Sequence, residues 1–413
     1  MNRRVVITGI GIISSLGNDK EIFFKNLLDK KMSISGIPDN YYKNYKFKSK
    51  FHVKSPEINL AEYNFSSYLN NITNDATKYA LLGTKNALID SGFTLENIDK
   101  KIKINEFNNK CIILIGEGFT NLEKSFKSYE SHIGISDKAF HRLCVPFMMP
   151  NAVSGWVSIS FDLHCPNFTI NASCASSSLA IGQSYEKIKY QDYDIAITGG
   201  IECLKDSSGA TMRAFDTLDV LTKSEDGIPR PFTDKRSGFL YNEGAGCILI
   251  LEELKSAIKR KAKIYAEISD FAANSDAYNI VQIDSSGRYI KELFSKIDIK
   301  NIDYINLHGT GTLLNDRVEK KVIKEIFGTK KNQPICNSTK GIIGHTIGAS
   351  GAIEAAVCAL SMKKKMIHGN LIDEEIQDLN LNIEIMNTKI NNALSLSFGF
   401  GGHNTILKFS KLE

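Results

Sequence analysis

Short apolar runs alternate with helical patterns along the whole chain. In the first part of the chain the apolar runs cover residues 4–11, 109–119, 194–202 and 244–254. Continuous runs of this kind are typical of strands in a sheet that is covered on both faces. Helical patterns lie between them at residues 73–92 and 176–192. The first begins on a plausible N-cap, Thr73 or Asn74, and ends at Gly92.

From about residue 256 the order of elements begins again. Further strand-like runs cover residues 263–275, 303–311, 393–402 and 404–411, and helical patterns cover residues 287–297 and 347–365. Alternating elements predict an α/β fold, and two sets of similar order suggest a duplication. We therefore expect two halves, residues 1–253 and 254–413, that share a large interface. The polar and aromatic segment 36–62 is expected to be an exposed excursion.

Composition narrows the class of protein. The chain has 413 residues, too many for one ordinary core, and its 42% hydrophobic and 23% charged residues are typical of a globular protein. Its formal charge of +5 is carried by dispersed basic residues. This balance argues against nucleic acid as a partner, but it suits a partner that is itself acidic.

Three features of the sequence bear on the cellular compartment in which the protein works. No apolar run reaches the roughly 18 residues needed to span a bilayer. Residues 1–17 begin like a signal peptide, but they lack a small-residue cleavage site, and their glycines fit a strand and turn better. None of the eight cysteines forms a CxxC pair, and most lie in apolar surroundings, which favours reduced, buried thiols. We expect a cytoplasmic enzyme with no membrane span.

One cysteine, Cys174, lies where a short β-like run changes to a helical pattern, in the stretch NFTINASCASSSLAIGQ at residues 167–183. Four interpretations are open: a packed core thiol, a metal ligand, half of a disulfide, or a nucleophile. At a helix start, free backbone N–H groups and the helix dipole favour an anion and lower the pKa of a thiol. The neighbouring alanines and serines leave room for a substrate to approach.

A second motif, NLHGTGTLLND at residues 306–316, places His308 at the end of a strand. The adjacent glycines let a ligand approach the backbone closely. Thr310 and Thr312 offer two hydroxyls on the same face of the loop. The alternative is a structural turn with a hydrogen-bonded histidine.

A third motif, CNSTKGIIGHTIGASGAIEAA at residues 336–356, places Lys340, His345 and Glu354 around a glycine-rich loop that enters a helix. The loop lacks the Walker A order of a phosphate-binding loop, and a metal site would require closer or more numerous ligands. Its small residues are equally compatible with a tightly packed helix.

The fourth motif, SLSFGFGGHN at residues 395–404, has three glycines around Phe398 and Phe400. Free N–H groups in such a loop can form half of an oxyanion hole, although a β-hairpin turn would also explain the glycines. Together, the cysteine, the two histidines, the lysine and the glycine loop form a set suited to acyl transfer through a thiol.

These motifs, with PRPFTDKRSGFLYNEGAGCILILEE and RKAKIYAEI between them, give the sequence an end-to-end resemblance to β-ketoacyl-acyl carrier protein synthases of the elongating type. The resemblance implies the thiolase fold, a duplicated five-layer αβαβα arrangement. It implies that Cys174 is the nucleophile and must be exposed and thiolate-prone. It also implies that His308 and His345 donate to an enolate oxygen, and that Glu354 supports the network of Lys340.

The same resemblance assigns the substrate contacts. Phe400 matches a gating phenylalanine whose N–H, with that of Cys174, forms the acyl oxyanion hole. Thr310 and Thr312 match hydroxyls that meet a phosphopantetheine arm, and Phe398 is expected in the substrate site. The implied reaction is a decarboxylative Claisen condensation: malonyl thioester loses CO2, and the carbanion attacks the acyl group on the cysteine to give a 3-ketoacyl product. No metal or redox cofactor is required.

Several residues depart from the family pattern. His403 stands where threonine is usual, which adds a titratable group to the expected substrate site. Asn279 replaces a histidine, and the segment after it is shorter than usual. Met148 and Met149 bring new side chains to the expected wall of the acyl pocket. These changes leave the acyl-chain preference open.

The resemblance also implies partners. An acidic acyl carrier protein would deliver the malonyl and acyl thioesters, with Arg213, Lys138 and Arg142 as candidate docking residues. A dimer is expected through the β run before Cys174, either a homodimer or a heterodimer with a chain-length factor.

Three other functions are alternatives to fatty-acid elongation. The first is the ketosynthase subunit of a type II polyketide or polyene pathway. The second is a non-catalytic partner subunit, which the cysteine and both histidines argue against. The third is a thiolase acting on coenzyme A esters, which the absence of a cysteine in the last glycine-rich motif argues against.

Overall fold

Ten strands form the centre of the protein in this computed structural model, which describes residues 3–120, 122–137 and 140–412. The strands predicted from the apolar runs are confirmed, although the one after residue 303 is short. The ten strands are β1 (Val5–Ile13), β6 (Cys111–Glu117), β7 (Asn167–Ile170), β8 (Ile195–Cys203), β10 (Gly244–Glu253), β11 (Ala266–Ser275), β12 (Tyr304–Asn306), β13 (Ile335–Asn337), β16 (Asn392–Gly399) and β17 (His403–Ser410).

The strands fall into two sets with the same topology. The first set has the spatial order β7-β6-β8-β10-β1, and the second has the order β13-β12-β16-β17-β11. In both sets the first strand of the chain pairs antiparallel with the last, the last strand pairs antiparallel with its other neighbour, and the two remaining pairings are parallel. β1 also pairs antiparallel with β11, which joins the sets into one ten-stranded sheet.

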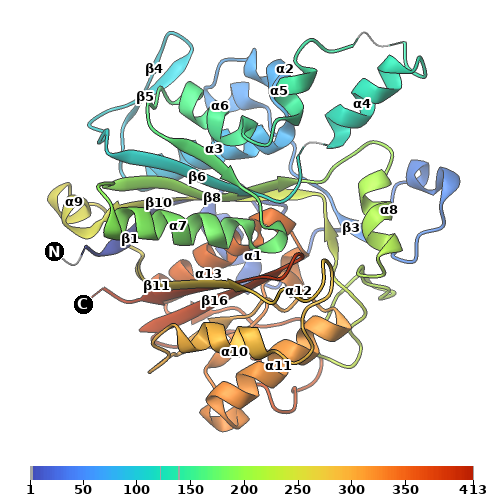
Figure 1. Cartoon of the computed structure of the whole chain (residues 1–413), viewed down its shortest axis with the longest axis vertical. Helices are drawn as coiled ribbons and strands as arrows, with labels where there is room; N and C mark the ends of the chain where they lie inside the picture. Colours follow the sequence, from blue (N-terminus) through green and yellow to red (C-terminus); the bar gives the residue numbers. More distant parts are fainter. Residues whose placement is uncertain (1–2, 121, 138–139, 413) are drawn as a thin grey trace.

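Helices cover both sets and separate them. α7 and α13 contact strands of both sets and form a middle layer, whereas α3 and α6 cover the outer face of the first set and α10 and α11 that of the second. Figure 1 shows the resulting five layers, αβαβα. The bounds are α3 (Asp75–Asp90), α6 (Ala152–Ser160), α7 (Ser176–Tyr190), α10 (Arg288–Ser295), α11 (Leu313–Phe327) and α13 (Ser350–Lys364).

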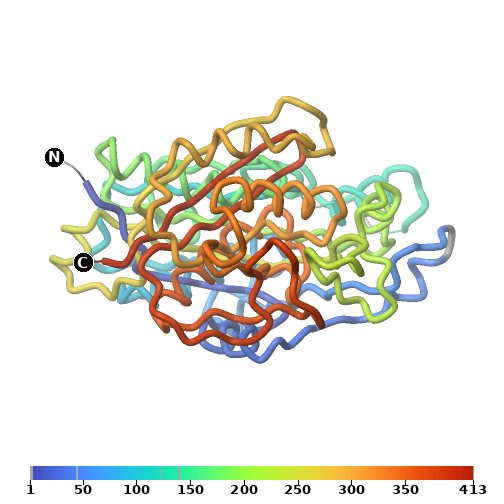
Figure 2. Tube along the Cα trace, turned by 90° about the horizontal axis from the view of Figure 1, so that it is seen from below, coloured from blue at the N-terminus to red at the C-terminus, as the bar shows by residue number. Residues whose placement is uncertain are grey.

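Local sequence explains where these elements begin. The side chain of Asn74 caps α3 by accepting from the N–H of Thr77 at 2.8 Å, and the chain leaves the helix through Gly92 at a φ of 88°. All residues of β1 and β10 are buried, as expected for strands between two helical layers. The predicted division after residue 253 falls between β10 and α9 (Leu254–Lys259). β1 begins and β17 ends on the same side of the molecule (Figures 1 and 2).

The prediction of an exposed excursion at residues 36–62 holds only in part, because exposed and buried residues alternate along the segment. Phe47, His52, Val53 and Leu60 are buried, and Nδ1 of His52 lies 2.9 Å from the carboxylate of Glu243. The segment contains the strand β3 (Phe51–Val53) and two short 3-10 helices, η1 (Asp39–Asn44) and η2 (Leu60–Tyr63). Its few apolar side chains are buried through contacts with residues far away in the sequence, which its polar composition does not reveal.

The remaining elements connect or cap these layers. No helix in the described part of the chain is long and apolar enough to cross a membrane. The bounds are α1 (Lys20–Leu28), α2 (Leu69–Ile72), α4 (Leu122–His132), α5 (Cys144–Met148), α8 (Ala210–Thr217), α12 (Lys340–Ile343), β2 (Ile34–Gly36), β4 (Leu95–Ile98), β5 (Lys101–Ile104), β9 (Tyr241–Asn242), β14 (Met366–Ile367), β15 (Met386–Asn387), η3 (Ser173–Ala175), η4 (Lys330–Asn332) and η5 (Ile347–Ala349).

Candidate active site

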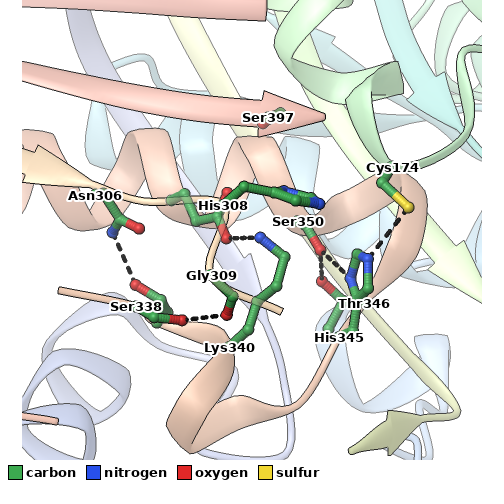
Figure 3. Close-up of polar contacts among 12 residues, drawn as sticks. Cys174, Asn306, His308, Gly309, Ser338, Lys340, His345, Thr346, Ser350 and Ser397 are labelled. Carbon is green, nitrogen blue, oxygen red and sulfur yellow. Dashed lines mark hydrogen bonds and ion pairs between the residues drawn. The ribbon is translucent and has the colours of Figure 1, made fainter. Parts of the chain in front are cut away.

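Cys174 lies in the short turn η3, between β7 and the first residue of α7. Ser173, with a φ of 52°, bends the chain so that the thiol points away from the helix and toward His345 (Figure 3). The residue is a free cysteine and only 4% exposed. The expectation of an exposed cysteine is therefore wrong: its thiol lines a cavity instead.

The expectation of a thiolate-prone cysteine is also wrong. Burial raises the pKa of Cys174 to about 11, against the opposing effects of the Ser173 hydroxyl, the charge of Lys340 and the backbone N–H of Phe400. Desolvation penalises the charged form more than these three groups favour it. In the free protein the buried site therefore favours the neutral thiol over the thiolate.

His345 follows α12 and is fixed by two donors to one ring nitrogen. Its Nδ1 accepts the N–H of Ile347 at 3.2 Å and lies 3.0 Å from Oγ of Ser350. A neutral ring that accepts at Nδ1 carries its proton on Nε2, and Nε2 lies 3.1 Å from Sγ of Cys174. This network thus aims an N–H group at the sulfur.

His308 comes from the loop after β12. The carboxylate of Glu319 fixes this loop by accepting the N–H groups of His308 and Gly309 at 2.7 and 2.8 Å. The rings of His308 and His345 meet edge to face with centroids 5.7 Å apart. Burial, followed by the charge of Lys340, lowers the pKa of both histidines well below 6.5. Both rings are therefore neutral at physiological pH and can act as hydrogen-bond donors.

Lys340 and Glu354 form a buried ion pair between α12 and α13. Both side chains are 1% exposed. Burial raises the pKa of Glu354 to about 7, and the adjacent Lys340 opposes this shift. Lys340 of this pair places a positive charge near both histidines and the cysteine. This charge disfavours protonation of the imidazoles and favours ionisation of the thiol.

A cavity of about 230 Å³ opens above these groups. Thr310 and Thr312 line it, with their hydroxyl oxygens 2.9 Å apart, and Phe398 and Phe400 form part of its apolar wall. The wider lining adds Leu218, Val220, Phe239, Ile283, Leu314 and Ile347. The cavity combines an apolar surface with two hydroxyls and ends at the thiol and the imidazoles.

The glycine-rich loop lies directly against the cysteine turn. A Cβ atom on Gly399 would lie 2.7 Å from the carbonyl oxygen of Ala172 and 3.3 Å from the nitrogen of Cys174, so no larger residue fits there. This contact brings the N–H of Phe400 to the cysteine side chain, where it lowers the thiol pKa. Two backbone donors, those of Cys174 and Phe400, thus come from adjacent segments.

Three predicted substrate contacts do not lie in the cavity. His403 is next to the lining residue Asn404 on β17, and successive strand residues point to opposite faces, so its side chain points away. Met148 and Met149 lie at the end of α5, where they are 37% and 40% exposed, and neither belongs to the cavity lining. Their apolar side chains lie on the outside of the first half.

The predicted docking residues are dispersed. Arg213 is exposed on α8, with its guanidinium 4.6 Å from the ring centroid of Tyr45. Arg142 is exposed in the segment before α5, and Lys138 lies outside the described residues. Asn279, the departure from a family histidine, accepts the N–H groups of residues 281 and 282 and shapes the rim of the cavity.

Sequence inspection missed the residues that hold the site in place. Glu319 and Ser350 position the two histidines, and Phe239 packs edge-on against the ring of His345 with centroids 4.9 Å apart. Glu202 accepts the N–H groups of Gly118 and Gly348, each at 3.0 Å. No local pattern marks these residues, because each acts across a long separation or within a helix.

Comparison with known proteins identifies the class. Residues 2–257 match the family model "Beta-ketoacyl synthase, N-terminal domain", and residues 265–372 match "Beta-ketoacyl synthase, C-terminal domain". The chain belongs to the β-ketoacyl synthase family of condensing acyltransferases.

Individual relatives agree with this assignment. The chain is 32% identical to 3-oxoacyl-acyl-carrier-protein synthase 1 of Haemophilus influenzae over 99% of both chains. It is 32% identical to synthase 2 of Staphylococcus aureus over 100% of this chain and 99% of the relative. A β-ketoacyl synthase from Burkholderia phymatum superimposes over 100% of both chains with a TM-score of 0.86 and 28% identity. The ishigamide ketosynthase/chain length factor, with a TM-score of 0.87 and 23% identity over 100% of both chains, shares the fold.

Proposed function

We propose that this enzyme elongates acyl chains by condensing malonyl-acyl carrier protein with an acyl group held on Cys174. The observation that carries the proposal is the contact between Sγ of Cys174 and Nε2 of His345 at 3.1 Å, beside a second neutral imidazole and at the end of a cavity. The products are 3-ketoacyl-acyl carrier protein and CO2.

In the first half-reaction the sulfur of Cys174 attacks the carbonyl carbon of an acyl thioester. A new carbon–sulfur bond forms, the bond to the pantetheine sulfur breaks, and the thiol proton passes to that leaving sulfur. The N–H groups of Cys174 and Phe400 hold the carbonyl oxygen as its negative charge develops. The N–H at Nε2 of His345 stabilises the attacking sulfur, whose ionisation burial otherwise opposes.

In the second half-reaction the malonyl thioester enters along Thr310 and Thr312. Loss of CO2 leaves an enolate, whose oxygen receives hydrogen bonds from His308 and His345. Neutral imidazoles suit this role because each keeps one N–H group at neutral pH and can donate it in a hydrogen bond. The enolate carbon then attacks the acyl carbonyl, the carbon–sulfur bond to Cys174 breaks, and the released thiolate takes up one proton from solvent to restore the thiol. The proposal uses no metal or redox cofactor.

The polyketide alternative requires the same chemistry on a different acyl chain. No feature of the described site favours it over fatty-acid elongation, whereas the 32% identical relatives are named 3-oxoacyl-acyl-carrier-protein synthases. The proposed partner is therefore the acyl carrier protein that bears the thioesters. The eight free cysteines support a reducing, cytoplasmic setting for the reaction.

We further propose a homodimer that pairs through β7. This strand is at one end of the ten-stranded sheet and carries Phe168, which is 54% exposed. Val145 on α5 and Ile159 on α6 are 65% and 53% exposed. An unpaired edge with apolar neighbours is a surface suited to pairing with a second copy. Light scattering should give twice the chain mass, and Phe168→Asp should give the single-chain mass.

Intact-protein mass spectrometry tests the main proposal. The enzyme is incubated with acyl carrier proteins that bear saturated, polyenoyl or ketoacyl chains, beside the Cys174→Ala variant. Adducts from saturated chains that disappear in the variant support fatty-acid elongation. Adducts from polyenoyl or ketoacyl chains alone would support the polyketide alternative, and the absence of any adduct on Cys174 would refute both.

A further inference from the structure

Two cysteines outside the active site lie side by side on neighbouring strands. The register of the parallel pair β6 and β7 puts Ile113 opposite Asn167, and the N–H of Ile113 donates to the carbonyl oxygen of Pro166 at 3.0 Å. Two residues earlier on each segment, Cys111, the first residue of β6, is opposite Cys165. Neighbouring strands lie about 4.8 Å apart, and a disulfide joins Cα atoms about 4.4–6.8 Å apart. The backbone therefore holds the two residues within the range of a disulfide.

Both thiols point to the same side of the sheet. Alternate residues of an extended chain share a face, so Cys165 faces the side of Thr169, whose hydroxyl donates to Oγ of Ser154 on α6 at 3.1 Å. Cys111 and Ile113 belong to the apolar core on that side, and Cys165 packs against the same core. The side chains of Cys111 and Cys165 are hydrogen-bonded to each other. No change of fold is needed to bring the two sulfur atoms together.

The two thiols of this pair are not equivalent. Among the eight cysteines, all of which the structure describes, Cys165 alone is half-buried and the others are buried. The hydrogen bond from Cys111 lowers the pKa of the Cys165 thiol, although burial opposes this shift, and the same bond raises the pKa of Cys111. Within the described residues no third side chain completes a metal site with them. Cys165 is therefore the thiol that an oxidant from solvent reaches first.

We propose that Cys111 and Cys165 are a redox-active pair, which a peroxide converts to a disulfide within one chain before it oxidises Cys174. The thiolate of Cys165 attacks one oxygen of hydrogen peroxide, and the O–O bond breaks. A sulfenic acid forms on Cys165, and the released hydroxide takes up the proton of that thiol to give water.

The second step closes the disulfide. The sulfur of Cys111 attacks the sulfur of the sulfenic acid, the S–S bond forms, and the hydroxyl group leaves as a second water with the proton of Cys111. Overall the two thiols lose two electrons and the peroxide gains them. A dithiol reductant such as dithiothreitol restores both thiols by exchange.

The pair is separate from the active site, so the inference goes beyond the proposed function. Neither Cys111 nor Cys165 lines the cavity, and the disulfide joins two segments that are already paired. Cys174 is 4% exposed, and burial raises the pKa of its thiol to about 11. Because a peroxide reacts with accessible thiolates, Cys165 should be oxidised before Cys174. Acylation of Cys174 should continue at the wild-type rate after the pair has been oxidised.

The test is a time course of oxidation on the full chain. The enzyme is reduced, separated from the reductant and exposed to a small excess of hydrogen peroxide, and the remaining thiols are then alkylated with N-ethylmaleimide. Peptide mass spectrometry should find Cys111 linked to Cys165, with the link forming about tenfold faster than Cys174 is oxidised. Dithiothreitol should remove the link.

Variants separate the roles of the two thiols. In Cys111→Ala the sulfenic acid on Cys165 has no partner, so trapping of Cys165 by dimedone should exceed that of the wild type. In Cys165→Ala, Cys111 should stay reduced over the same exposure. Cys203→Ala removes another buried thiol from the same core and is the matched control, which should form the link as the wild type does.

Three results would overturn the inference. The first is the absence of the linked peptide at peroxide levels that oxidise Cys174. The second is a link between the Cys165 residues of two chains, which electrophoresis without reductant separates from a link within one chain. The third is equal dimedone trapping in Cys111→Ala and the wild type, because Cys111 would then not react with the sulfenic acid. The first two need only the wild-type enzyme, so they decide the matter even if a variant does not fold.

Discussion

The turns that precede α7 and α13 have the same local architecture but serve different chemistry. Each is a three-residue 3-10 turn that leads into a helix of 15 residues. Each begins on a non-glycine residue with a positive φ, 52° at Ser173 and 41° at Ile347. Such values are uncommon for serine and more so for a β-branched isoleucine, so the duplicated fold imposes the same bend twice.

The two turns differ at the central residue. In the first half this residue is Cys174, whose thiol faces the cavity. In the second half it is Gly348, and a Cβ there would lie 2.3 Å from the nitrogen of Gly118. The second turn positions His345 instead, through Ser350 at the start of α13. The comparison teaches that the bend and the helix start do not by themselves make a reactive site: in the proposed reaction one copy holds the covalent intermediate, and the other positions its hydrogen-bond donor.

The largest expected effect comes from removing the chemistry of the first turn. Cys174→Ala should lower the condensation rate about 10⁴-fold or more, because no acyl-enzyme can form. The thermal unfolding midpoint should stay near that of the wild type, since the substitution removes one sulfur atom from a cavity wall. Condensation assays with malonyl-acyl carrier protein check the rate. A variant with more than a few per cent of wild-type activity would place the acyl group elsewhere.

Removing the imidazole positioned by the second turn should have the next largest effect. His345→Ala should lower condensation about 10²- to 10³-fold, the range for a lost transition-state donor, while the acyl adduct on Cys174 still forms. Ser350→Ala is the matched probe of positioning and should cost less, about tenfold, because the N–H of Ile347 still fixes Nδ1. Equal losses in both variants would contradict the assigned tautomer.

Gly348→Ala tests why the second turn carries no side chain. The added methyl group must displace the backbone of Gly118 or the carboxylate of Glu202, so we expect a loss of about 1–3 kcal/mol in the free energy of unfolding. Gly36→Ala, where nothing lies within 4 Å of the added atom, is the control and should change stability by less than about 0.5 kcal/mol. Denaturant titration measures both. A stable Gly348→Ala variant would show that the two turns tolerate the same residues.

The smallest but most specific effect concerns pH. Because the pKa of Cys174 is raised to about 11, its thiolate fraction and its alkylation by iodoacetamide should rise about tenfold per pH unit from pH 7 upward. Site-resolved mass spectrometry after short exposures measures this rate. A plateau near pH 8 would instead indicate the exposed, thiolate-prone cysteine predicted from the helix start.

Sequence patterns predicted the strands, the α3 cap and the residues that the structure brings together around the cavity. Cys174, His308 and His345 were predictable because each lies in a short motif at the end of a strand or the start of a helix. His403, from the last of these motifs, does not belong to the cavity lining. Asn404 and His403 are adjacent on β17, and only one of two adjacent strand residues can face the cavity.

Contacts between distant segments were not predictable in this way. Glu319 reaches back from α11 to the loop of His308, and Gly399 packs against the turn of Cys174 across more than 200 residues. Burial of the thiol also depends on this packing, so the sequence favoured a lowered pKa where the structure raises it. Local chemistry is encoded locally, whereas solvent exclusion depends on the whole fold.

A single-turnover experiment tests the central claim most directly. The enzyme is first loaded with a hexanoyl group on Cys174 and separated from the donor, and malonyl-acyl carrier protein is then added. We predict that the adduct on Cys174 disappears as 3-ketooctanoyl-acyl carrier protein and CO2 appear in equal amounts. An adduct that persists, or that is released as free hexanoate without a ketoacyl product, would contradict the account.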